Sequence, residues 1–149
     1  MIEHILGAAV EVARVADSDR EWAVQRPSRS VSAVRDSVRI PTRWQRFHDC
    51  VVQRESGGNP TARNPRSSAQ GLFQFLDRSW RRGLAYMVAD RLRDNGASRA
   101  QAKAVRIWLQ GREIATWPAQ YQRMGFLEVV QRGGSYHWRL AGSACEAWR

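Results

Sequence analysis

Long apolar runs are missing from this sequence of 149 residues. A helix that crosses a bilayer needs about 20 consecutive, mostly apolar residues, and no run here approaches that length. The run Ile5–Val10 is cut short by Glu11, and Glu3 stands where a secretory leader would carry basic residues. The sequence therefore predicts a globular chain with no membrane span and no evident signal peptide. Its hydrophobic content of 43% suits a packed core.

Lysine and acidic residues are scarce. The chain has 24 Lys and Arg against 14 Asp and Glu, which gives a net charge of +10, and Lys103 is the one lysine. Residues 1–41 contain six arginines and six acids, so the whole excess lies in residues 42–149. A basic surface attracts polyanions over a long range. Nucleic acid, an anionic membrane and the bacterial cell wall are therefore candidate partners, and a surface charge that only aids solubility is the alternative.

Cysteine and histidine are also rare. The two cysteines are Cys50 and Cys145. A disulfide between them would close a loop of about 95 residues, stabilise the fold by roughly 4–5 kcal/mol and indicate an oxidising location. Two buried thiols are the alternative. The three histidines are scattered along the chain without the spacing of metal ligands, so we expect no metal site and no cofactor.

The spacing of apolar residues predicts a mainly helical α+β domain over residues 42–149. We expect a helix over residues 2–16 and an arm rich in Arg, Ser and Pro over residues 26–41 to precede it. The first helix of the domain carries Trp44, Phe47, Val51 and Glu55 on one face, because their spacings are three, four and four. Further helices are expected over residues 79–94, from Ser98 to Gly111 and from Trp117 towards Gly125, with a β-hairpin formed by residues 126–130 and 136–140 around Gly133 and Gly134.

Glu55 is the best candidate for a reactive group. It lies on the apolar face of its predicted helix, just before Gly57 and Gly58 end that helix. Desolvation on this face and the negative end of the helix dipole both favour a protonated carboxyl group. Such a group can donate a proton to a leaving oxygen. The alternative is a surface glutamate beside a turn.

No second carboxylate follows Glu55 closely, since the next acid is Asp77. Glycosidases that use two carboxylates hold them about 5–10 Å apart. Asp77 precedes the helix predicted from Ser79, so a role as a helix cap is the simpler interpretation. The spacing of the acids alone leaves open a second carboxylate that is distant in sequence but adjacent in space.

Two motifs in order carry a resemblance to a known family. The run Glu55-Ser56-Gly57-Gly58-Asn59-Pro60 is followed by Asn64-Pro65 and then by Ala69-Gln70-Gly71-Leu72-Phe73-Gln74-Phe75. This layout resembles the lysozyme-like lytic transglycosylases, especially the transglycosylase-like domains of actinobacterial and phage proteins, and more distantly the resuscitation-promoting factors. The resemblance is strong over residues 47–80, weaker from there to the C-terminus, and does not cover residues 1–41.

The resemblance implies a lysozyme-like catalytic domain over residues 42–149 with Glu55 as its acid and base. Ser56 would orient Glu55 or contact the glycan. Phe73 and Gln74 would contact the glycan, with Gln74 matching the glutamine of the family's Gly-Leu-x-Gln motif. The family's later Ala-Tyr-Asn-Ala-Gly motif is absent. Its nearest counterpart is Tyr121, which follows Trp117, and both rings are candidate sugar contacts.

The reaction implied is cleavage of the MurNAc–GlcNAc bond of peptidoglycan. Glu55 would protonate the leaving oxygen and then act as base while the muramyl C6 hydroxyl attacks C1, which gives a 1,6-anhydro sugar. Two alternatives stay open: a lysozyme-type hydrolase of the same bond, and a catalytically silent virion or wall-binding protein. A nucleic-acid partner is not expected, because no motif for one is present.

The location follows from the expected disulfide and the missing signal peptide. An enzyme with a disulfide but no leader needs another way out of the cell, and a phage particle provides one. We therefore expect a virion, extracellular or cell-wall location. Residues 1–41 are the candidate segment for docking to a phage tail or capsid protein.

Overall fold

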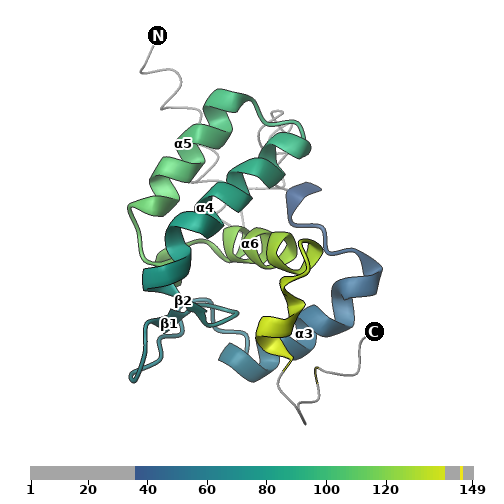
Figure 1. Cartoon of the computed structure of the whole chain (residues 1–149), viewed down its shortest axis with the longest axis vertical. Helices are drawn as coiled ribbons and strands as arrows, with labels where there is room; N and C mark the ends of the chain where they lie inside the picture. The colour runs from purple at the N-terminus through teal and green to yellow at the C-terminus, as the bar shows by residue number, and fades with distance from the viewer. Residues whose placement is uncertain (1–35, 140–144, 146–149) are drawn as a thin grey trace, which may run out of the picture.

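Residues 36–139 and Cys145 are described by a computed structural model of the chain (Figure 1). The helix predicted over residues 2–16 lies outside the described residues, as does the predicted arm up to residue 35. Within the described part the fold is mainly helical with a small antiparallel sheet, which confirms the predicted mainly-α, α+β class. Its elements are α3 (Thr42–Ser56), β1 (Ala69–Gln70), β2 (Phe75–Leu76), α4 (Asp77–Asp94), α5 (Arg99–Gln110), the 3-10 helix η2 (Ile114–Thr116), α6 (Ala119–Gln131) and the 3-10 helix η3 (Gly134–Trp138).

Helix α6 crosses the middle of the molecule, with α4 and α5 on one side and α3 on the other (Figure 1). Every residue from Met124 to Val130 is buried. Gly125 permits a close approach of α4, because a Cβ at this position would lie 3.1 Å from Leu84 Cδ2. The sequence of a helix that is buried on all sides is a continuous apolar run and lacks the amphipathic stripe of a surface helix.

This burial explains why the hairpin prediction is wrong. Residues 126–130 belong to α6, which continues to Gln131, and residues 134–138 form η3. A short apolar run has the same composition in a buried helix and in a buried strand. A type I′ hairpin turn also needs positive φ at both central residues, and of the two glycines only Gly133 has it, at 88°.

The other predicted helices exist, with shifted ends. The capping box of α5 is confirmed, since Ser98 Oγ accepts from Gln101 N and Gln101 Oε1 accepts from Ser98 N. Helix α4 begins at Asp77 rather than near Ser79, and the Asp77 side chain makes no capping bond. The prediction of Asp77 as a helix cap is therefore wrong, because its carboxylate bonds to Arg81, one turn later on α4, and to Ile114 N in η2.

The segment just before α3 packs against the core. Ser37 is fully buried, its hydroxyl donates to Arg91 O at 3.4 Å, and Arg91 Nε donates back to Ser37 O. Arg91 Nη1 also bonds Glu128 Oε1 and Gln131 Oε1, at 3.1 Å each. The last residues of the predicted arm are thus tied to α4 and α6. The domain boundary at residues 41 and 42 stays a prediction.

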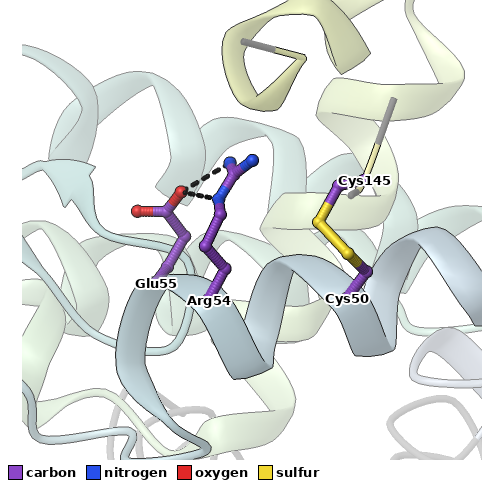
Figure 2. The surroundings of a disulfide bond; sticks show 4 residues. All are labelled: Cys50, Arg54, Glu55 and Cys145. Atoms are coloured by element: carbon purple, nitrogen blue, oxygen red, sulfur yellow. Dashed lines mark hydrogen bonds and ion pairs between the residues drawn. A yellow bond between two sulfur atoms is a disulfide. The ribbon is translucent and has the colours of Figure 1, made fainter. Parts of the chain in front are cut away.

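The disulfide between Cys50 and Cys145 is present, with Cα atoms 5.5 Å apart. It joins the middle of α3 to a residue 95 positions later, so Cys145 is held beside the helix that carries Glu55 (Figure 2). The predicted pairing is confirmed. Among the described residues, no helix has both the length and the apolar character needed to span a membrane.

Candidate active site

Glu55 occupies the last turn of α3, where the helix passes from the core to the surface. Phe47 and Val51, on the same face, are fully buried, whereas 25% of the Glu55 side chain is exposed. Arg54 donates two bonds to one carboxylate oxygen, Oε1, from Nε at 2.9 Å and from Nη2 at 2.6 Å (Figure 2). Within the described part of the chain, the other oxygen, Oε2, has no hydrogen-bond partner. The carboxyl group is thus oriented through one oxygen and open to a ligand through the other.

Ser56 closes the helix rather than orienting Glu55. Its hydroxyl donates to Val52 O at 3.1 Å and accepts from Gly58 N at 3.2 Å. Gly57 follows with a φ of 60°, a left-handed conformation that glycine adopts at little cost. The hydroxyl of Ser56 therefore bonds to the backbone at the helix end and not to Glu55.

The second motif forms the β1–β2 hairpin. Ala69 pairs with Leu76 and Gln70 pairs with Phe75, so Gly71–Gln74 makes the turn between the strands. Gln74 has a φ of 52° and is the one residue other than glycine with a positive φ in the described ranges. Its Nε2 donates to Gly71 O at 3.0 Å. A left-handed conformation costs a residue with a Cβ roughly 1–2 kcal/mol, and strain of this kind concentrates at functional sites.

The hairpin is tied to the loop that follows Glu55. Gly71 N donates to Ala62 O at 2.8 Å, and Asn64 N donates to Ala69 O at 2.9 Å. The two predicted motifs, although separated in sequence, thus form one connected segment.

Three of the aromatic rings predicted to contact sugar are buried. Phe73 stacks on Phe126 with ring centroids 4.4 Å apart. Trp117 Nε1 donates to Leu109 O at 3.1 Å and to Arg112 O at 3.0 Å, and Tyr121 is fully buried. The structure places these rings in the core and not at the surface.

Asp77 is also buried and fully engaged. Its Oδ1 accepts from Ile114 N at 2.8 Å and from Arg81 Nε at 3.0 Å, and its Oδ2 accepts from Arg81 Nη2. The hydrogen bond to Asp77 raises the pKa of Arg81. A carboxylate held in this way is a structural anchor and is poorly suited to activating water.

A cluster of buried polar side chains, which sequence reasoning missed, surrounds η2. Asp77 holds Ile114 N, Gln70 Oε1 accepts from Ala115 N at 3.0 Å, and Gln122 Nε2 donates to Ile114 O at 3.1 Å. We call these three side chains, Gln70, Asp77 and Gln122, the polar hub. No local pattern in the sequence signals this cluster, because Gln122 stands between Tyr121 and Arg123, before the apolar run that begins at Met124.

An exposed row of aromatic rings was also missed, because residues 136–140 were assigned to a strand. The Tyr136 ring lies 4.1 Å from that of His137, which meets Trp80 edge-on at 4.8 Å. Trp80 in turn lies 5.6 Å from Phe75, the residue after Gln74. Tyr136 is 66% exposed. We call Tyr136, His137 and Trp80 the aromatic row.

His48 is the remaining buried titratable group on α3. Its Nδ1 lies 2.9 Å from Asp49 Oδ1, whereas Nε2 has no partner. Burial lowers the pKa of His48, so the ring is neutral at neutral pH. No group of three His, Cys, Asp or Glu side chains within residues 36–139 and Cys145 is arranged to hold a metal ion.

Known proteins similar to this chain are named as probable transglycosylases. The chain is 27% identical over 140 residues to the probable transglycosylase SceD of Staphylococcus aureus strains Newman and USA300, and 26% identical to that of strain Mu3. The similarity covers 94% of this chain and 50% of the staphylococcal proteins, so the chain spans about half their length. It therefore extends into residues 1–41, where the motifs gave no resemblance. No family model matches the chain, and no solved structure matches it.

Proposed function

We propose that this protein cleaves the glycan strands of peptidoglycan between MurNAc and GlcNAc, as a lytic transglycosylase. The observation that carries the proposal is Glu55, a part-exposed carboxyl group with one open oxygen at the end of α3. It precedes a loop bonded to the Gly71–Gln74 turn. The distant similarity to proteins named as probable transglycosylases supports the same activity.

The two oxygens of Glu55 suit two roles. In the protonated group, Oε1 keeps the bonds from Arg54 while Oε2 carries the proton towards the glycosidic oxygen. The C1–O bond breaks as that proton moves to the leaving GlcNAc. The muramyl C6 hydroxyl then attacks C1, and its proton returns to the carboxylate of Glu55. No water is consumed, so the reaction needs no second carboxylate.

Gln74 is proposed to contact the glycan. The strained φ of 52° supports this role, because a glycine at the same position would avoid the strain. Gln74 Nε2 donates one of its two hydrogens to Gly71 O. The second hydrogen and the side-chain oxygen Oε1 remain available to a sugar hydroxyl or an N-acetyl group.

We propose the aromatic row, and not the buried rings of Phe73, Trp117 and Tyr121, as the surface on which sugar rings stack. The C–H face of a pyranose is attracted to the negative face of an aromatic ring. Tyr136 is the most exposed of the large hydrophobic side chains described. The row begins beside Phe75, directly after Gln74, so it continues from the proposed glycan contact.

The products of digestion test the reaction. Mass spectrometry of purified peptidoglycan digested by the full chain should find 1,6-anhydromuramyl ends. Reducing muramyl ends would contradict this and identify the hydrolase alternative. A digest with no new ends, matched by an unchanged digest from the Glu55→Gln variant, would identify the catalytically silent alternative.

We further propose that the protein acts outside the cytoplasm, at the cell wall, and that a phage particle delivers it. The disulfide supports an oxidising location. The net charge of +10 suits an anionic wall polymer. The docking role of residues 1–41 is part of this proposal, and residues 1–35 lie outside the described residues.

A further inference from the structure

Gln122 connects the two motif segments through a single buried side chain. Only 1% of the residue is exposed. Its Oε1 accepts from Leu72 N at 2.7 Å, in the Gly71–Gln74 turn. Its Nε2 lies 3.0 Å from Pro60 O, in the loop that follows Glu55. One amide on α6 therefore spans from one motif to the other.

The orientation of this amide is fixed by its surroundings. Nε2 faces three carbonyl oxygens, those of Pro60, Ile114 and Trp117, at 2.9–3.1 Å, while Oε1 faces an N–H group. The flipped amide would oppose a donor to a donor and an oxygen to three oxygens. Because two hydrogens serve three carbonyls, one of them is shared, and all of the amide's donors are occupied.

Gly71, a residue of the second motif, depends on the same side chain. A Cβ built on Gly71 would lie 2.3 Å from Gln122 Oε1, closer than two such atoms can approach. The φ of 79° at Gly71 independently favours glycine. The space that a side chain at residue 71 would need is thus filled by a glutamine 51 positions later.

We propose that Gln122 is a positioning residue for glycan cleavage, which sets the spacing between the loop after Glu55 and the turn that carries Gln74. This inference rests on the proposed function. The Leu72 bond holds the turn from which Gln74 projects, and Gln74 itself bonds back to Gly71 O. The Pro60 bond holds the loop that follows Glu55 and the end of α3. A change of about 1 Å between groups that hold the substrate can reduce the rate of a chemical step by roughly 100-fold.

A buried polar cluster at the other end of α4 provides a matched control. Arg91 bonds Ser37 O, Glu128 and Gln131, so Arg91→Met also removes a buried polar side chain with several partners. Position 91 is 14 residues from Asp77, which places it roughly 20 Å along the helix axis from the polar hub. It touches neither motif segment.

The test compares Gln122→Met, Gln122→Glu and Arg91→Met with the full wild-type chain. The rate and KM are measured on soluble glycan strands from purified peptidoglycan, at a temperature where circular dichroism finds every variant folded. Gln122→Met keeps the volume and loses all four bonds. We expect its kcat to fall by about 10- to 100-fold, with a smaller change in KM. Arg91→Met should lose thermal stability but keep its kcat.

The pH profile separates a positioning role from a purely structural one. In Gln122→Glu the introduced carboxylate still accepts from Leu72 N but cannot donate to Pro60 O. As the pH falls, the buried carboxyl group gains a proton and can donate one bond again. The kcat of this variant, relative to wild type at the same pH, should therefore rise as the pH is lowered.

Three results decide the matter. A folded Gln122→Met variant with wild-type kcat would overturn the inference, as would an equal loss of kcat in Arg91→Met or a flat relative pH profile for Gln122→Glu. The wild type and the Glu55→Gln variant distinguish failure of the proposed function from failure of this inference. If the proposed function is wrong, the wild type leaves the strands intact, or Glu55→Gln cleaves them at the wild-type rate.

Discussion

At the scale of single residues, the predicted chemistry depends on the one ionisable proton of Glu55. Glu55→Gln keeps the shape of the side chain and removes that proton, so we expect cleavage to fall by at least about 100-fold, the low end for general acid–base catalysis. The fold should persist, because the part-exposed Arg54 pair is worth at most about 1 kcal/mol. Release of dye-labelled peptidoglycan fragments measures the rate.

Glu113→Gln is the control for this change. Glu113 also pairs with an arginine, Arg63, and both side chains are 48% exposed. The control should cleave at the wild-type rate. Full activity in Glu55→Gln would remove the basis of the assignment.

Gln74 offers a second residue-scale prediction, in which stability and activity move apart. Gln74→Gly relieves a strain of roughly 1–2 kcal/mol and loses one hydrogen bond worth about 1 kcal/mol. We expect a melting temperature equal to or above that of wild type, together with reduced cleavage. Gln74→Ala keeps the backbone strain, so both its melting temperature and its rate of cleavage should fall. Calorimetry and the cleavage assay are the measurements, and wild-type cleavage by folded Gln74→Gly would exclude a role for the side chain.

At the scale of elements, η3 is predicted to present a sugar-stacking surface. Tyr136→Ala removes the outermost ring of the aromatic row, and a stacking contact of about 0.5–1.5 kcal/mol corresponds to roughly a 2- to 10-fold rise in KM. The kcat should change little, since the ring touches no reacting atom. Kinetics on soluble glycan strands provide the measurement.

Tyr86→Ala is the matched control for the aromatic row. Tyr86 is a 44% exposed tyrosine on α4, with the Arg106 guanidinium 4.4 Å from its ring centroid. If Tyr86→Ala raised KM as much as Tyr136→Ala does, the row would have no special role in binding glycan.

The disulfide is a second prediction at this scale. Cys50→Ser combined with Cys145→Ser should lower the free energy of unfolding by about 2–5 kcal/mol, because the unfolded chain regains the freedom of a long loop. Urea denaturation measures the loss, and reduction of the wild type should reproduce it. Non-reducing peptide mapping that found free thiols in protein from an oxidising medium would contradict the pairing.

The elements also indicate what the sequence is able to predict. Helices α3, α4 and α5 each have one apolar and one polar face, and their periodicity and the capping box of α5 located them to within two residues. Helix α6 has no polar face, because it is enclosed by its neighbours. Periodicity therefore carried no signal there, and the C-terminal half of α6 was misassigned.

The candidate site divides in the same way. Glu55 and Gln74 lie in local motifs, which a sequence displays directly. The roles of Gln122 and Asp77 depend on bonds to residues 37 to 62 positions away, which no local pattern encodes. The burial of Trp117 and Tyr121 could likewise not be predicted from the sequence. An aromatic ring near a loop has the same sequence context whether it faces solvent or the core.

At the scale of the whole molecule, the described domain should work without the N-terminal region. Deletion of residues 1–35 leaves the Ser37–Arg91 contacts in place, so we expect folding and glycan cleavage to persist. If a phage particle carries the protein, the same deletion should abolish its incorporation, as measured by immunoblotting of purified particles. Unchanged incorporation would remove residues 1–35 as the docking segment.

The shared space of Gly71 and Gln122 has a consequence for how this chain can diverge. The Cβ that any other residue would bring to position 71 falls on the Gln122 amide, so a substitution there is tolerated only if position 122 shrinks in the same lineage. A smaller residue at position 122 would remove this clash, but the φ of 79° would still favour glycine at position 71. An alignment of relatives should therefore contain no lineage in which position 71 has changed while Gln122 is kept.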